Sequence, residues 1–116
     1  MRRAPAILLL LACAHAPPQP WRGLTRQQAV EVCLPPGEQA YLSSLQCPDG
    51  AAAQAHRIGS VGSRNQTTSD DPRLLQQMDP GEPLKPGELD LHIVDAFEVQ
   101  CPTELKTVYL DMYHCR

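Results

Sequence analysis

The sequence predicts a small α+β domain in which two helices cover an antiparallel sheet of about three strands. Hydrophobic and polar residues alternate over 89–101 and again over 106–114, a pattern typical of half-buried strands. Apolar residues at helical spacing precede them, within 25–45. The chain of 116 residues carries five cysteines. Because so short a chain buries only a modest core, disulfides are expected to staple it.

Two short helices are expected in the first half of the domain. Thr25 and Gln28 match a capping box, and an apolar helical face follows over 29–33. The Pro-Pro-Gly run at 35–37 is expected to end this helix. A second helix is expected to start near Glu38 and to turn three residues inward: Tyr41, Leu42 and Leu45.

The middle of the chain is expected to hold one strand and one long loop. Residues 55–61 read as a short strand that Gly59 weakens, and we expect it to lie antiparallel to 89–99. Residues 62–88 read as loop, with a brief helix over 73–78. A connection of this length is typically functional or disordered.

The two C-terminal strands form a hairpin with a predictable register. A four-residue loop pairs Cys101 with Lys106, which places both apolar sets on one side of the hairpin. The expected pairs that follow are Val99 with Val108, Phe97 with Leu110, and Asp95 with Met112. Asp95 is the one polar residue in the apolar series, and we expect a β-bulge to turn it outward.

This register selects among the three possible pairings of the last four cysteines. Cys115 would lie roughly 30 Å from Cys101 along the hairpin, far beyond the roughly 7 Å that a disulfide spans. Cys33 and Cys47 bracket the second helix, whose ends lie roughly 15 Å apart. The start of the 55–61 strand brings Cys47 close to Cys101. The predicted bonds are therefore Cys47–Cys101 and Cys33–Cys115.

The first residues have the features of an export signal. Arg2 and Arg3 precede an apolar run at 6–12 that is too short to span a bilayer. The four residues Leu10-Leu11-Ala12-Cys13 resemble the lipobox of bacterial lipoproteins. The resemblance implies a signal peptide at 1–12 and acylation of Cys13, which would become the first residue of the mature chain. Residues 13–22 would then be a proline-containing tether, and 23–116 a single domain.

An alternative cleavage site competes with the lipobox. Ala14-His15-Ala16 fits the small-x-small pattern of ordinary signal peptidase, and cleavage after Ala16 would give a secreted protein without an anchor. Both processing routes leave the same four cysteines, so their number does not distinguish them. Either route predicts an oxidising compartment in which these cysteines form disulfides.

Candidate chemistry is confined to the last third of the chain. His92, Asp90 and Asp111, with His114 nearby, offer ligands for a divalent transition metal, but their spacing matches no metal motif. We therefore expect the polar face of the hairpin to be solvated. The sequence has no Cys-x-x-Cys, glycine-rich phosphate loop or nucleophile elbow. No catalytic residue or cofactor is expected, which favours a non-enzymatic protein.

Together these features predict an exported envelope lipoprotein that acts as a binding or structural module, with an envelope protein as partner and a lipid anchor in the membrane. One alternative is a secreted inhibitor or ligand that presents the 62–88 loop. Another is a small metal-dependent enzyme that uses the Asp/His cluster. The net charge is −3, and no basic surface is apparent, which argues against a nucleic-acid partner.

Overall fold

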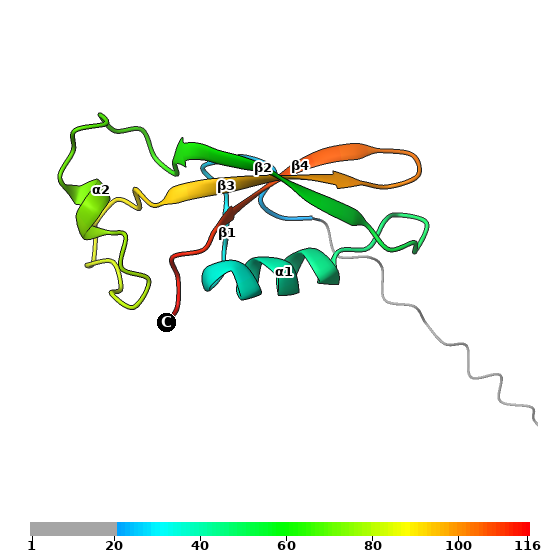
Figure 1. Cartoon of the computed structure of the whole chain (residues 1–116), viewed down its shortest axis with the longest axis horizontal. Helices are drawn as coiled ribbons and strands as arrows, with labels where there is room; N and C mark the ends of the chain where they lie inside the picture. The colour runs from blue at the N-terminus through cyan, green and yellow to red at the C-terminus, as the bar shows by residue number, and fades with distance from the viewer. Residues whose placement is uncertain (1–20) are drawn as a thin grey trace, which may run out of the picture.

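A computed structural model of the chain describes residues 21–116 (Figure 1). The predicted signal peptide at 1–12, the acylation site Cys13 and the cleavage site after Ala16 lie outside the described residues. No helix within 21–116 is long and apolar enough to cross a membrane.

Six elements form an α+β domain around one sheet (Figure 1). In chain order they are β1 (Val30–Glu31), α1 (Leu34–Ser44), β2 (Gln54–Ser63), α2 (Arg73–Gln76), β3 (Ile93–Gln100) and β4 (Leu105–Asp111). The sheet has four strands in the order β1-β4-β3-β2. It is mixed rather than purely antiparallel, because β1 runs parallel to β4 while the other two pairings are antiparallel.

The prediction of a helix after Thr25 is wrong, because the structure has a turn and then the strand β1 there. Gln28 donates its backbone N–H to both the carbonyl and the hydroxyl of Thr25, at 3.2 Å each, so the predicted local cap forms a turn. The chain then extends into β1, where Val30 pairs with Leu110 and is buried. The tertiary pairing therefore overrides a local helix signal.

The prolines expected to end a helix instead lie at the start of α1. Pro35 and Pro36 follow Leu34 in its first turn, where a missing N–H costs no hydrogen bond. As a result one helix, rather than two, covers the apolar face of the sheet (Figure 1). Leu42 and Leu45 are buried as their spacing predicts, and Tyr41 packs partly buried against the core.

The hairpin forms with a register two residues away from the predicted one. Gln100 pairs with Leu105, and the amide of Cys101 donates to the carbonyl of Glu104 at 2.8 Å, so the loop spans 101–104. The pairs are Phe97 with Val108 and Asp95 with Leu110. A shift by two leaves every side chain on its predicted face. The hydrophobic core therefore contains the expected residues: Phe97, Val99, Val108 and Leu110, with Val30, Leu42 and Leu45.

Asp95 is not turned outward. It stays on the apolar face with 6 % of its surface exposed. The irregularity lies in β2 instead, where the register shifts between Arg57 and Gly59. Arg57 and Ser60 then meet one carboxylate oxygen of Asp95 at 2.9 and 3.1 Å. These two partners compensate part of the cost of burying the carboxylate.

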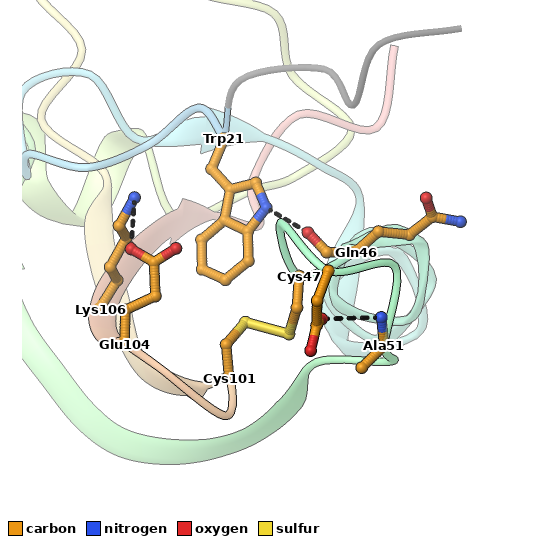
Figure 2. The surroundings of a disulfide bond; sticks show 8 residues. Trp21, Gln46, Cys47, Ala51, Cys101, Glu104 and Lys106 are labelled. Carbon is orange, nitrogen blue, oxygen red and sulfur yellow. Dashed lines mark hydrogen bonds and ion pairs between the residues drawn. A yellow bond between two sulfur atoms is a disulfide. The ribbon is translucent and has the colours of Figure 1, made fainter. Parts of the chain in front are cut away.

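Two disulfides close the domain, and they join the pairs that the sequence predicts. Cys33 is bonded to Cys115 and Cys47 to Cys101. The first bond ties the start of α1 to the C-terminal segment. The second ties the segment after α1 to the β3–β4 loop, and it lies beside the indole of Trp21 (Figure 2).

Trp21 belongs to the folded domain and not to the tether that the sequence predicts. Its indole N–H donates to the carbonyl of Gln46 at 2.9 Å, and the ammonium of Lys106 lies 5.3 Å from its ring centroid (Figure 2). The carbonyl of Arg22 likewise accepts a hydrogen bond from the hydroxyl of Tyr41 at 3.3 Å. The folded part thus includes residues 21 and 22.

Candidate metal centre

The hairpin topology gathers two acids and two histidines at one end of the sheet. Asp90 and His92 immediately precede β3, while Asp111 ends β4 and His114 follows it. Because β3 and β4 are antiparallel neighbours, the start of one lies beside the end of the other (Figure 1). Residues about twenty positions apart in sequence therefore meet.

Four potential ligand atoms converge there, all within 4.8 Å of one another. His114 Nε2 lies 2.9 Å from both Asp90 Oδ2 and Asp111 Oδ2. His92 Nδ1 lies 3.1 Å from Asp111 Oδ2 and 3.3 Å from His114 Nε2. An ion with tetrahedral bonds of about 2.0–2.1 Å separates its ligand atoms by about 3.3 Å, so small side-chain shifts would accommodate one.

The cluster is buried, which corrects the expectation of a solvated polar face. Asp111 is fully buried, His92 is 4 % exposed, and the side chains of Asp90 and His114 retain only a narrow contact with solvent. The 80–84 part of the long loop shelters it and borders a cavity of about 90 Å³ beside the two histidines. The amide of Cys115 donates to the carbonyl of Pro80 at 3.2 Å and closes this side.

Two further charged residues complete the cluster. Arg64, just after β2, donates from Nη1 to Asp90 Oδ2 at 2.9 Å and to Glu31 Oε1 at 2.8 Å. It also lies 3.7 Å from Asp111 Oδ2. Sequence reasoning missed Arg64 and Glu31 because both lie far from the hairpin in sequence. The position of Glu31 in β1 next to Asp111 depends on the parallel pairing, for which the sequence offers no signal.

The carboxylates hold a proton on His92. Burial opposes charge on this imidazole, but hydrogen bonds to Asp111 and Asp90 outweigh it and raise the pKa of His92 to about 9. Burial likewise opposes charge on Asp90, yet hydrogen bonds from His92 and its other neighbours lower the pKa of this carboxyl well below its usual range. The His92 Nε2 atom is buried and has no partner among the described residues.

The charges in this cluster suit a divalent cation. The carboxylates of Glu31, Asp90 and Asp111 carry three negative charges, and the guanidinium of Arg64 carries one positive charge. The net charge of these four groups is therefore −2. Two imidazolium groups, or one divalent ion with two neutral histidines, would neutralise them. Imidazole nitrogen and carboxylate oxygen are ligands of zinc and its first-row neighbours. The unpartnered Nε2 atom of His92 departs from most such sites, because a ligating histidine usually donates its second N–H to an outer partner.

Comparison with protein families, curated proteins and solved structures finds no match to this chain. The candidate site therefore rests on the geometry and chemistry of its own residues.

Proposed function

We propose that this protein is an exported, non-enzymatic module of the bacterial cell envelope that binds one divalent first-row transition metal, zinc fitting best. The convergence of the ligand atoms of Asp90, His92, Asp111 and His114 within 4.8 Å carries the proposal. Four protein ligands would fill a tetrahedral zinc ion, as in structural sites, whereas catalytic zinc keeps one position for water or substrate. This favours a binding or structural role over the alternative of a metal-dependent enzyme.

Arg64 would remain as an outer partner of such a centre. Its guanidinium bonds to Asp90 and Glu31, and hydrogen bonds of this kind orient ligating carboxylates in metal proteins. The disulfides support export, because they form and persist in oxidising compartments.

Metal binding is tested on the mature chain after removal of bound metal with EDTA. We expect calorimetric titration with zinc to give one site per chain, and Co²⁺ to give the visible absorption of a tetrahedral centre. His114→Gln removes a ligand at the edge of the cluster and should weaken zinc at least about tenfold.

His56→Gln is the matched control, because His56 is an exposed histidine outside the cluster. It should bind zinc as the parent does. Absence of binding by the parent at micromolar free Zn²⁺, Co²⁺ and Ni²⁺ would reject the metal proposal, as would equal zinc affinity in the two histidine variants.

Anchoring at Cys13 is a separate part of the proposal, with a separate measurement. Intact mass and amino-terminal peptide mapping of the protein recovered from bacterial membranes should give an acylated Cys13 as the first residue, and Cys13→Ser should abolish the modification. A soluble product that starts at Pro17 would instead establish cleavage after Ala16.

That second outcome would favour the alternative of a secreted inhibitor or ligand. One structural observation supports it: the segment that joins β2 to β3 presents Leu75 and Met78 with 78 % and 48 % of their surfaces exposed. Gln77, between them, is buried and holds the segment through hydrogen bonds to the backbone of Leu89 and Leu91. A fixed loop with exposed apolar side chains suits protein recognition.

A further inference from the structure

A pocket of about 280 Å³ lies between α1 and the sheet, and none of the four candidate metal ligands lines it. Its floor holds two carboxyl side chains, Glu38 from α1 and Asp95 from β3. Apolar side chains form much of the wall, among them Leu42, Phe97 and Met112. Small-molecule sites commonly combine apolar walls with a few convergent polar groups.

The two carboxyl groups are buried together. Glu38 is 4 % exposed and Asp95 is 6 % exposed, and Asp95 is close enough to Glu38 to help raise the pKa of its carboxyl group. The second oxygen of Glu38, Oε2, is buried and has no hydrogen-bond partner among residues 21–116. A buried acceptor without a donor destabilises the protein, so a ligand that brings donors to this pair would satisfy that acceptor.

The charges around the pair are unbalanced. Facing Glu38 are Asp95 from β3, Arg57 and His56 from β2, and Tyr113 beyond β4. Arg57 balances one carboxylate through its 2.9 Å contact with Asp95. If Glu38 also ionised, one negative charge would remain uncompensated in the pocket. The free protein avoids this by keeping a proton on Glu38, because burial and then the neighbouring Asp95 raise the pKa of Glu38 to about 8.

We propose that this pocket binds a small alkylamine, whose ammonium group donates hydrogen bonds to the carboxylates of Glu38 and Asp95. An ammonium group supplies a positive charge and three donors, and it would replace the proton that the free pair shares. The alkyl part would lie along the apolar wall at Leu42 and Phe97. The proposed site uses none of the metal ligands, so it is independent of the metal proposal.

The test uses n-butylamine as the probe and butan-1-ol as its neutral counterpart, titrated into the ¹⁵N-labelled mature chain at pH 7. We expect saturable shifts of the amide signals of α1 and β3 with the amine, and no saturable binding of the alcohol. Glu38→Gln should weaken butylamine about tenfold or more, because it removes one charged acceptor.

Glu38→Gln is expected to fold, since glutamine keeps a donor for Asp95 and the parent side chain is already protonated at pH 7. The matched control is Glu104→Gln, which removes the same charge from the β3–β4 loop at a residue that does not line the pocket. Its affinity for butylamine should equal that of the parent.

A second readout separates specific binding from general attraction to an acidic protein. Because an ammonium would displace the proton of Glu38, calorimetry at pH 7 in two buffers of different ionisation enthalpy should show release of nearly one proton. Below pH 8, the affinity for butylamine should increase about tenfold for each unit by which the pH is raised, because less free energy is then needed to remove the proton from Glu38. The amine itself stays charged over this range. Glu38→Gln should abolish both effects, and Glu104→Gln, which lies outside the pocket, should keep them. Equal affinity of Glu38→Gln and the parent, or binding without proton release, would overturn the proposal.

Discussion

Replacing Cys47 and Cys101 with alanine is expected to lower the free energy of unfolding by about 4 kcal/mol or more. The bond closes a sequence separation of 54 residues, so its loss restores much chain entropy to the unfolded state. Both sulfur atoms also lie in the buried part of the domain, where alanine leaves unfilled space. Urea denaturation under non-reducing conditions measures the loss.

The matched variant is the double replacement of Cys33 and Cys115, which opens a separation of 82 residues. Chain entropy predicts a similar loss, about 4–5 kcal/mol. A domain of this size has a total stability of about 5–15 kcal/mol, so either variant should be marginal and the fully reduced chain largely unfolded. If both variants unfold at the same urea concentration as the parent, the hydrophobic core alone holds the fold and the expectation is wrong.

Asp111→Asn in the metal-free protein is expected to lower the free energy of unfolding by roughly 3–5 kcal/mol near pH 6, the usual range for breaking a buried ion pair. Asparagine has the same shape, but it removes the charge that faces the imidazole of His92 at 3.1 Å and Arg64 at 3.7 Å. Because Asp111 is fully buried, water cannot replace the lost charge.

The loss of unfolding free energy caused by Asp111→Asn should become smaller as the pH rises. The pKa of His92 is about 9 in the folded protein, above its ordinary value of 6.5. The stabilisation from its protonated form is therefore complete below pH 6.5 and is lost as the pH rises through 9. The difference between the parent and Asp111→Asn should accordingly be greatest near pH 6 and narrow towards pH 9. Denaturation in urea with EDTA, repeated across this range, measures it.

Asp49→Asn serves as the control for this series. Asp49 accepts an exposed hydrogen bond from the amide of Ala51 within a turn, and asparagine can accept the same bond. Its effect should stay within about 0.5 kcal/mol at every pH. A difference for Asp111→Asn that grows towards pH 9 would show that Asp111 does not stabilise a charged His92.

Elements in which apolar and polar residues alternate regularly could be predicted from the sequence. Elements that form through contacts between residues far apart in the sequence could not. The alternation in the C-terminal third is clear because one face of both strands is buried, and a two-residue error in register left those faces unchanged. The capping signal at Thr25 was real but local. The parallel pairing of Val30 with Leu110 decided the outcome, and it joins residues 80 positions apart.

The candidate site follows the same division. The sequence singled out Asp90, His92 and Asp111, because their carboxylates and imidazole share the polar face of the predicted hairpin. It could not show that the long loop and β1 would bury them, or that Arg64 would join them. The pair of Glu38 and Asp95 was also invisible as a pair, since it depends on where α1 lies across the sheet.

The sequence by itself determined a small α+β domain, its two disulfide pairs and the apolar faces of its hairpin, because side-chain period and disulfide reach are local geometric constraints. Only the tertiary structure decided that one helix rather than two covers the sheet and that β1 pairs in parallel with β4. It alone also decided that the candidate metal site and the pair of Glu38 and Asp95 are buried. Those features depend on contacts between residues far apart in the chain, and neither period nor spacing encodes such contacts.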